Sequence, residues 1–430
     1  MNTASILRVA TNAPLSRLFD YLAPTDTAVA PGCRVRVQFG RQTQIGLVME
    51  VANQSELPIS KLRSVTEVID TSPLLAASDL WLVKFTSDYY HHPIGEVVAA
   101  ALPALLRQGR PLQDVVQRLS LTKAGLQTEP AQLSKRAKRQ AELLTLIQGF
   151  DDPTFTTLDE AMPGWRRLKK SLLDKALVVE ITTIDSGRDK NSLTVAEQES
   201  GPPLNSDQSE ALASIRRVDG FRTTLLDGVT GSGKTEVYLR LMADEIAAGR
   251  QVLVLVPEIG LTPQLVRRFE RRLGFEPVVL HSGLSDSERL SAWRGAREGS
   301  AQLIVGTRSA IFVPMRTPGL IIVDEEHDAS LKQQEGLRYS ARDLAVARAK
   351  KLNVPVILGS ATPSLETLQR CREGAYEIAE LPIRAGNAVP PLMRLIDLTR
   401  FDAQDGLSEP VVKAITKNID SNGQVLIYLN

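Results

Sequence analysis

The pattern of hydrophobic and polar residues changes along the chain and divides it into regions. Near the N-terminus, Arg34 to Phe39 alternates polar and apolar residues, as a half-buried strand does, and Ile45 to Val51 follows as a second strand. Gly32 and Gly40 flank the first strand, which predicts a hairpin or a small barrel. A helical pattern then runs from Ser78, a candidate N-cap, to Tyr89. Residues 1–108 are therefore expected to form one small β-rich domain.

The next region has the periodicity of helices. Ser134 to Phe150 places apolar residues at helical spacing, and Trp165 to Ile181 begins as a helix and becomes a strand at Leu177. Helices followed by a short β-element predict a winged-helix-like domain over residues 109–184. Residues 185–203 are polar and end in Gly-Pro-Pro, which is typical of a linker.

From Leu204 onward, apolar strands alternate with amphipathic helices. This pattern predicts a parallel sheet with helices on both faces, because strands buried on both sides are almost continuously apolar. We expect one complete α/β lobe over residues 204–388 and the start of a second over 389–430, opened by a strand at Val425 to Leu429. The strands expected in the first lobe begin at Thr223, Gln251, Ala301, Gly319 and Val354.

Composition narrows the class of protein. The chain has 430 residues, with 51 basic and 50 acidic side chains, which excludes a uniformly basic, histone-like protein but permits local DNA contacts. Cys33 and Cys371 lie far apart, so neither a disulfide framework nor a structural zinc site is expected. No signal peptide is evident, and no apolar run reaches the about 18 residues that span a bilayer. We therefore expect a soluble, multidomain, cytosolic protein with no membrane partner.

The strongest chemical signal is the segment GVTGSGKT, which lies between an expected strand and an expected helix. Its glycines allow backbone N–H groups to surround a phosphate, and the following helix N-terminus favours an anion. Lys234 is expected to reach the β- and γ-phosphates of ATP, and the Thr235 hydroxyl to bind Mg²⁺. The residues of this P-loop are Gly228, Val229, Thr230, Gly231, Ser232, Gly233, Lys234 and Thr235.

Two further motifs follow apolar strands. In IIVDEEHD, we expect Asp324 to hold Mg²⁺ through water and Glu325 to polarise the attacking water. In ILGSATPSLE, Ser360 and Thr362 follow another strand. By themselves, these two hydroxyl residues are better explained as caps of the next helix, with Pro363 in its first turn.

Together, the P-loop, DEEH and SAT motifs in this order resemble the first RecA-like lobe of a superfamily 2 helicase. Four further segments narrow this resemblance: LNSDQSEAL, VLVPEIGLTPQL, HSGLSDSERL and IVGTRSAIF. They resemble motifs of the PriA family of bacterial replication-restart helicases, also called primosomal protein N′. The resemblance implies that Gln208 reads adenine, that His327, Ser360 and Thr362 couple ATP to DNA, and that Thr307, Arg308 and Tyr339 contact DNA. Tyr339 lies in LKQQEGLRYSARDLA, a loop that carries more aromatic residues in the family.

The N-terminal segments RLFDYLAP, GCRVRVQFG and YYHHPIGEVV resemble the domain with which this family binds the 3′ end of a nascent strand. The resemblance implies a pocket built by Phe19, Asp20, Gly40 and Arg63, where the family often has lysine at the last position. An aromatic ring can stack on a terminal base, and a carboxylate can accept a hydrogen bond from a 3′-OH. From the residues themselves, Phe19 is better explained as a core side chain.

The resemblance implies an ATP- and Mg²⁺-dependent 3′→5′ DNA helicase that recognises stalled forks and initiates primosome assembly. Its implied partners are branched and single-stranded DNA, fork 3′ ends, primosome loading proteins and single-strand-binding protein, in a nucleoid-associated cytoplasmic location. The family's zinc module, with eight cysteines, and the arginine motif of its second lobe are not in these residues. We therefore expect the chain to bind forks without efficient hydrolysis or unwinding. The alternatives are a non-enzymatic fork-binding fragment and a P-loop kinase or transporter ATPase.

Overall fold

The structure is a computed structural model that divides into two units, Met1–Ile383 and Arg384–Asn430. It describes all residues except 1–4, 26, 114, 131–132, 134–136, 151–152, 185–198, 218–219, 386–391, 402 and 429–430. Most of the expected linker, and the expected boundary between residues 388 and 389, lie outside the described residues.

The N-terminal region contains a six-stranded sheet with the order β5-β2-β1-β4-β3-β6, and three helices. The predicted hairpin is confirmed, because β3 and β4 pair antiparallel from Arg34↔Leu47 to Phe39↔Gln42. The strands are β1 (Ile6–Ala10), β2 (Phe19–Leu22), β3 (Arg34–Phe39), β4 (Gln42–Ala52), β5 (Arg63–Ser64) and β6 (Glu67–Val68), and the helices are α1 (Ala77–Tyr89), α2 (Ile94–Ala101) and α3 (Ala104–Arg107).

The start of the first helix differs from the prediction. The N-cap of α1 is Ala76 and not Ser78. The carboxylate of Asp79 supplies the capping interaction, since it accepts a hydrogen bond from the Ala76 N–H at 3.1 Å. An acid at the third position of the first turn can therefore replace a capping hydroxyl.

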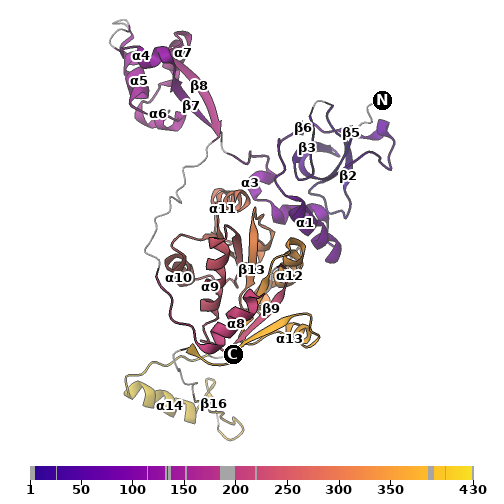
Figure 1. Ribbon diagram of the computed structural model, residues 1–430, viewed down its shortest axis with the longest axis vertical. Coiled ribbons are helices and arrows are strands. Elements are labelled where there is room, and N and C mark those ends of the chain that lie inside the picture. Colours follow the sequence, from indigo (N-terminus) through magenta and orange to yellow (C-terminus); the bar gives the residue numbers. More distant parts are fainter. Residues whose placement is uncertain are drawn as a thin grey trace. The chain divides into compact units, whose positions relative to one another are not determined.

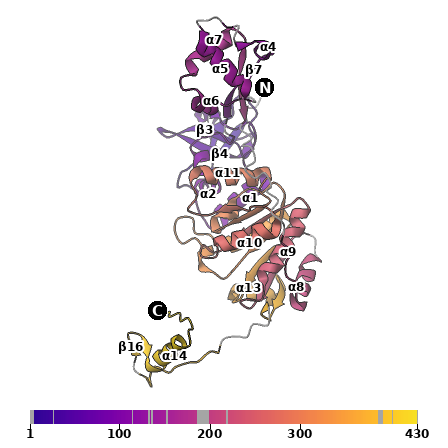
Figure 2. The same cartoon turned by 90° about the vertical axis from the view of Figure 1, so that its left-hand side faces the viewer.

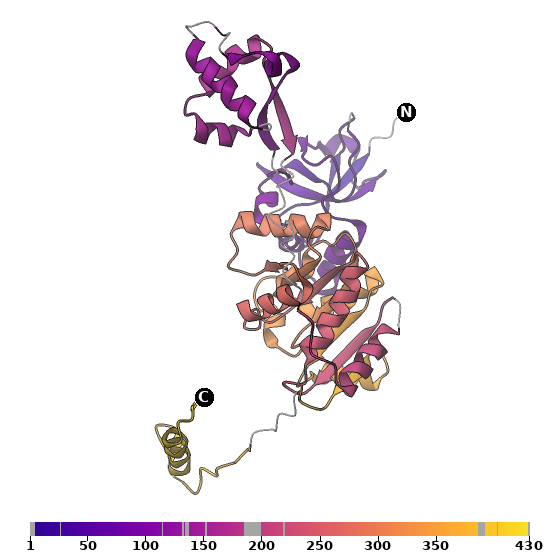
Figure 3. The same cartoon turned by 60° about the vertical axis from the view of Figure 1, so that its left-hand side comes forward.

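Residues 115–184 fold around a two-stranded ribbon (Figure 3). Strand β7 (Val115–Leu121) pairs antiparallel with β8 (Val178–Ile184). The strand β7 was not predicted, and it comes before the helices, whereas the sequence indicated a β-element only after them. The winged-helix assignment stays a prediction. The intervening helices are α4 (Lys123–Gln127), α5 (Lys138–Gly149), α6 (Phe155–Ala161) and α7 (Arg166–Asp174).

The expected parallel sheet is confirmed and is larger than predicted. It has seven strands in the order β11-β12-β10-β13-β14-β9-β15, and every pair is parallel. The two strands that the sequence did not indicate are β11 and β15, which form its two edges. The strands are β9 (Thr223–Gly228), β10 (Gln251–Leu255), β11 (Val278–Leu280), β12 (Leu303–Gly306), β13 (Pro318–Val323), β14 (Val356–Ser360) and β15 (Glu377–Leu381).

Helices cover both faces of this RecA-like sheet (Figures 1 and 2). Buried side chains of α8 (Ser206–Arg216), α9 (Lys234–Ala247) and α10 (Pro263–Leu273) form one apolar cluster with the sheet. Those of α11 (Asp286–Glu298) and α12 (Ala341–Leu352) form a second cluster, against which α13 (Leu365–Arg372) also packs. The carboxyl ends of the strands therefore meet at an edge between two layers of helices.

The second apolar cluster continues into the N-terminal region, so α1 and α2 share one core with the lobe. The Trp293 indole N–H donates to the carbonyl of Ala101 at 3.0 Å, and Arg297 donates to the carbonyls of Pro73 and Leu74. Helices α2 and α3 are therefore fixed against the lobe. Over the described parts of the chain, no helix is both long and apolar enough to cross a membrane.

The second unit contains two short paired strands, β16 (Ala403–Gln404) and β17 (Leu407–Ser408), and the helix α14 (Glu409–Asp420). The prediction of a strand from Val425 is wrong for the residues described there, since 423–428 form no strand. Leu426 is 96% exposed and Tyr428 is 87% exposed. A strand needs a neighbour for its backbone hydrogen bonds, and no described strand pairs with this segment.

A candidate nucleotide and DNA site

The P-loop joins β9 to α9 at the carboxyl edge of the sheet. Gly231 and Gly233 have φ angles of 81° and 88°, which side chains other than glycine rarely tolerate. Helix α9 begins at Lys234, whose Nζ donates to the carbonyl of Gly228 at 2.9 Å. The loop therefore has the turn geometry and the helix N-terminus that an anion site requires.

Neighbouring groups hold the loop closely. The Val229 N–H donates to the carbonyl of Leu381 in β15 at 3.2 Å. A Cβ on Gly228 would lie 2.5 Å from the hydroxyl of Ser232, so only glycine fits there. That hydroxyl is buried without a hydrogen-bond partner among the described residues, which leaves a polar group inside the loop.

Gln208 braces the loop from α8. Its side-chain N–H donates to the Ser232 carbonyl at 2.8 Å, while its oxygen accepts from the Asn205 N–H at 3.1 Å. Gln208 is 5% exposed. Both ends of this side-chain amide therefore form hydrogen bonds within the protein. The expected contact of Gln208 with adenine stays a prediction.

Asp324 and Glu325 follow β13, which lies beside β14, which in turn lies beside β9. The hydroxyl of Tyr238 donates to Asp324 Oδ1 at 3.0 Å, which orients the carboxylate. Burial, reinforced by the charge of Glu325, raises the pKa of Asp324, and burial raises that of Tyr238 well above its ordinary value. Two neighbouring acids, one of which has a raised pKa, favour a bound cation.

The expected coupling residues come together. His327 Nδ1 lies 2.8 Å from the Ser360 hydroxyl, and His327 Nε2 lies 3.2 Å from the Thr362 hydroxyl. The Thr362 N–H also donates to Ser360 Oγ at 3.0 Å. Because Ser360 ends β14 and His327 follows β13, this cluster joins the ends of two adjacent strands.

Sequence reasoning missed Glu326, the third acid of the DEEH motif. Its carboxylate accepts hydrogen bonds from the Ser364 N–H at 2.7 Å, from the Thr367 hydroxyl at 2.9 Å and from Arg342 at 2.9 Å. The side chain is fully buried. It therefore ties the acid loop to α12 and α13.

Sequence reasoning also missed Tyr238. This residue lies four positions after Lys234, so both side chains share one face of α9, which is the signal that could have found it. Gly359 makes room for it, since a Cβ there would lie 1.5 Å from the Tyr238 hydroxyl oxygen.

The three residues expected to contact DNA from the lobe line one cavity of about 300 Å³. Arg308 donates to the carbonyl of Ser330 at 3.1 Å and lies 3.7 Å from Glu258. Thr307 and Tyr339 are buried, with 6% and 5% exposure, and the Tyr339 ring packs against Phe312. The structure does not expose Tyr339 for stacking on a base.

In the expected 3′-end pocket, Phe19 and Asp20 lie on β2 and Arg63 on the neighbouring strand β5, while Gly40 follows β3. Arg63 donates to the carbonyl of Gly40 at 3.1 Å. The half-buried Phe19 ring contacts Phe39, with 4.8 Å between the ring centres. Asp20 lies 3.8 Å from Arg8 on β1, and Arg63 is not its ion-pair partner.

The residues at the P-loop fit a nucleotide-bound Mg²⁺. Among the described residues, no cluster of three or more His, Cys, Asp and Glu side chains is placed to hold a metal ion by itself. Mg²⁺ with nucleotides uses one or two protein groups together with phosphate oxygens and water. Thr235 lies in the first turn of α9, and its hydroxyl is a suitable ligand for that mode. The carboxylates of Asp324 and Glu325 are suitable ligands as well.

Comparisons with known proteins agree with this geometry. Residues 8–103 match the family model of a 3′ DNA-binding domain, and residues 205–371 match that of a DEAD/DEAH box helicase. The structure of RecG bound to a three-way DNA junction is 26% identical, with a TM-score of 0.34, and the match covers 45% of this chain and 25% of that one.

Two curated relatives carry the name replication restart protein PriA. The one from Haemophilus influenzae is 38% identical over 426 residues, which covers 99% of this chain and 58% of the relative. The one from Bacillus subtilis is 30% identical over 503 residues, which covers 100% of this chain and 62% of the relative. The chain thus spans about three fifths of the length of these relatives. With both family models matched in order and relatives of one name along its whole length, the chain belongs to the PriA family of replication restart proteins.

Proposed function

We propose that this chain carries the nucleotide-binding lobe and the DNA-end-binding domain of an ATP-dependent 3′→5′ DNA helicase of replication restart. The observation that carries this proposal is the order β13-β14-β9 in the sheet. This order brings the P-loop, the acids Asp324 and Glu325, and the cluster of His327 and Ser360 to one edge. Such an arrangement suits ATP hydrolysis that is linked to movement on DNA.

Each residue of the site has its own role in ATP binding or hydrolysis. Lys234 and the backbone N–H groups of the loop bind the phosphates, while Thr235 and Asp324 would hold Mg²⁺. Bound Mg²⁺ supplies positive charge against the developing negative charge of the phosphate oxygens. Glu325 orients a water for attack, and His327 passes the state of the site to Ser360 and Thr362.

The substrate that we propose is a stalled or abandoned replication fork. Phe19, Gly40 and Arg63 would receive the nascent-strand 3′ end, with Asp20 accepting from its 3′-OH. Thr307 and Arg308 would contact a single strand at the lobe. We further propose that the protein takes part in primosome assembly, with loading proteins and single-strand-binding protein, in the cytoplasm. This part of the proposal rests on the relatives' name, replication restart protein.

A variant of the P-loop tests the motor. Lys234→Ala should lower DNA-stimulated ATPase activity by about 10²–10³-fold, because a charge that stabilises the transition state is removed. Fork affinity should stay within about twofold of that of the wild type. Loss of fork binding with the fold intact would contradict the proposed separation of roles.

A second candidate is a fork-DNA-binding fragment without motor activity. It is favoured by the described part of the second unit, where β16, β17 and α14 build no further parallel sheet. Steady-state ATPase assays of residues 1–430 with forked DNA separate the two candidates, since the fragment would show little turnover.

The end-binding proposal has its own test. Forks whose nascent strand ends in a 3′-OH should bind more tightly than forks that end in a 3′-phosphate, as measured by fluorescence anisotropy. Asp20→Asn should remove this preference. Equal affinity of the wild-type chain for both forks would exclude the pocket.

A further inference from the structure

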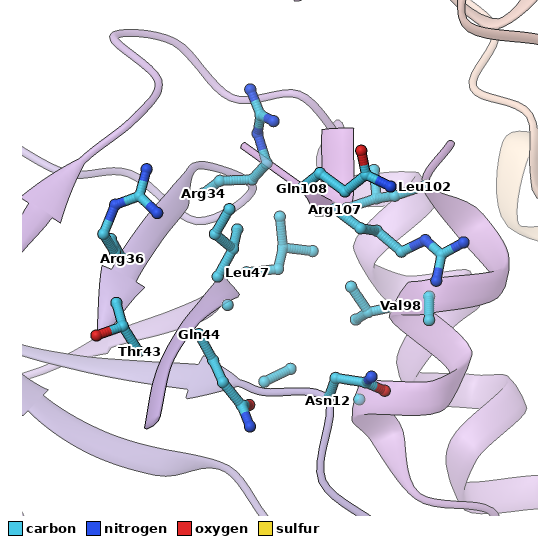
Figure 4. Close-up of a pocket in the computed structure, with 15 residues that line it drawn as sticks. Asn12, Arg34, Arg36, Thr43, Gln44, Leu47, Val98, Leu102, Arg107 and Gln108 are labelled. Atoms are coloured by element: carbon cyan, nitrogen blue, oxygen red, sulfur yellow. The ribbon is translucent and has the colours of Figure 1, made fainter. Parts of the chain in front are cut away.

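A cavity of about 370 Å³ lies between the β3–β4 hairpin and helices α2 and α3 (Figure 4). None of the residues expected at the 3′-end pocket lines it. Figure 4 shows Arg36 and Arg107 on opposite sides of Leu47 and Val98, with Gln44 and Asn12 along the lower border. The cavity is therefore distinct from the expected 3′-end pocket of the N-terminal domain and is lined by different side chains.

The border of this cavity is positively charged. Its lining contains three arginines and no acidic residue. Arg34 is neutralised by Asp70 at 2.7 Å, and Arg36 is paired with Glu67 at 2.6 Å. Arg107 is exposed and has no ion pair within the described parts of the chain. An unpaired guanidinium at the mouth of a cavity fits an anion such as a phosphate.

The interior of the cavity has apolar walls and one hydrogen-bond acceptor without a donor among the described residues. Leu47, Val98 and Leu102 supply the apolar surface. Gln44 Oε1 is buried without a hydrogen-bond partner among the described residues. Leaving such an acceptor unpaired is unfavourable, so its presence points to a ligand that donates a hydrogen bond. The amino groups of nucleobases are donors that glutamine binds.

Two further cavities adjoin this one in the direction of Thr307 and Arg308. It shares Ala99, Leu102 and Arg107 with a second cavity of about 240 Å³ on the other side of α2 and α3. This second cavity shares Arg289 and Ser309 with the cavity that Thr307 and Arg308 line. Three adjoining cavities thus follow α2 and α3 from the lobe to the hairpin.

We infer that the cavity bordered by Gln44 and Arg107 is a nucleotide subsite for single-stranded DNA. A base packs against the half-buried Ile45, beside Leu47, and donates to Gln44, while the adjacent phosphate lies between Arg36 and Arg107. The strand continues along α2 and α3 toward Thr307 and Arg308. This inference rests on the proposed DNA-binding function and adds a contact that does not depend on a free 3′ end.

The test measures binding of a labelled single-stranded oligonucleotide of mixed sequence that ends in a 3′-phosphate, by fluorescence anisotropy with residues 1–430. Arg107→Glu should weaken binding at least about fivefold and reduce the slope of log K against log salt by about 1. Gln44→Leu, which keeps the size of the side chain, should weaken binding without changing that slope. The matched control is Lys84→Glu, which makes the same charge change at an exposed position of α1 that lines none of the three cavities.

The outcomes are distinguishable. If Arg107→Glu and Lys84→Glu bind equally well, the subsite is wrong while the proposed DNA binding stands. If the wild-type chain does not bind the oligonucleotide, both fall. If Arg107→Glu weakens binding of a labelled acidic peptide and leaves DNA binding unchanged, the cavity is a peptide site and the inference is overturned. Equal unfolding midpoints of all variants establish that each one is folded.

Discussion

Arg348 of the lobe and Asp79 of the N-terminal domain form a buried ion pair, with 3.4 Å between Nη2 and Oδ1. Their side chains are 4% and 7% exposed. Arg348 also donates to the carbonyls of Ile311 and Val313, each at 2.7 Å, in the segment that follows Thr307 and Arg308. Burial raises the pKa of Asp79 and lowers that of Arg348. Each charge is therefore maintained by the other.

We predict that Asp79→Ala lowers the free energy of unfolding by about 3 kcal/mol, because Arg348 would be left as a buried, unpaired charge. Asp79→Asn should cost less, since it still accepts from the Ala76 N–H. Urea unfolding followed by tryptophan fluorescence measures both. As a control, Glu50→Ala breaks the exposed pair with Arg8 and should cost less than about 1 kcal/mol. A cost for Asp79→Ala no greater than the control's would contradict the assignment.

Glu326→Ala should also destabilise the fold by about 3 kcal/mol, as its carboxylate is fully buried and accepts from Arg342, Ser364 and Thr367. Glu325→Ala changes the neighbouring acid, whose side chain is 41% exposed, and should cost less than about 1 kcal/mol. Thermal unfolding of the two variants compares them. Equal destabilisation would show that Glu326 has no special structural role.

The raised pKa of Asp324 predicts a pH dependence. A carboxyl with a higher pKa in the folded than in the unfolded chain destabilises the fold when it is ionised. Asp324→Asn should therefore be more stable than the wild type at neutral pH without Mg²⁺. This advantage should shrink as the pH falls through the folded-state pKa and vanish below the unfolded value of about 3.9.

Unfolding at a series of pH values, from about pH 4 to about pH 8, measures the Asp324 effect. Glu50→Gln, which removes an exposed carboxylate, controls for the general loss of a negative charge. An advantage of Asp324→Asn that stays constant with pH would contradict the prediction.

Trp293→Phe should lower stability by about 1–2 kcal/mol, because the carbonyl of Ala101 would lose its donor inside the protein. The substitution loosens α2 against the lobe, so limited proteolysis near residues 101–104 should become faster. Trp81→Phe is the control, since the half-buried Trp81 stacks on Phe85 and its indole N–H makes no hydrogen bond to a described residue.

The parts of the site that could be predicted from the sequence are those whose residues lie next to one another in the chain. The P-loop, the acids after β13 and the hydroxyls after β14 each form one short segment, and apolar runs place the strands that bring them together. β11 was missed because it has three residues, too few to show a periodicity. The burial of Tyr339 could not be predicted either, since an aromatic residue in a loop gives no sign of a partner such as Phe312.

Glu326 shows why consecutive acids are difficult to assign from sequence. Glu325 has a φ of 47°, a left-handed conformation that is uncommon for residues with a Cβ. This turn separates the side chains, so that Asp324 meets Tyr238 while Glu326 meets Arg342. Nothing in the letters DEEH indicates where the backbone turns.

The hydrogen bond from Val229 to the carbonyl of Leu381 has a mechanical meaning. Leu381 ends β15, an edge strand, and the first unit ends soon afterwards at Ile383. A shift at the carboxyl end of β15 would thus act directly on the carbonyl that accepts from the second amide of the P-loop. The phosphate loop is therefore linked to the edge of the sheet by one backbone hydrogen bond, so a local change at the end of β15 would reach the loop without passing through the other strands.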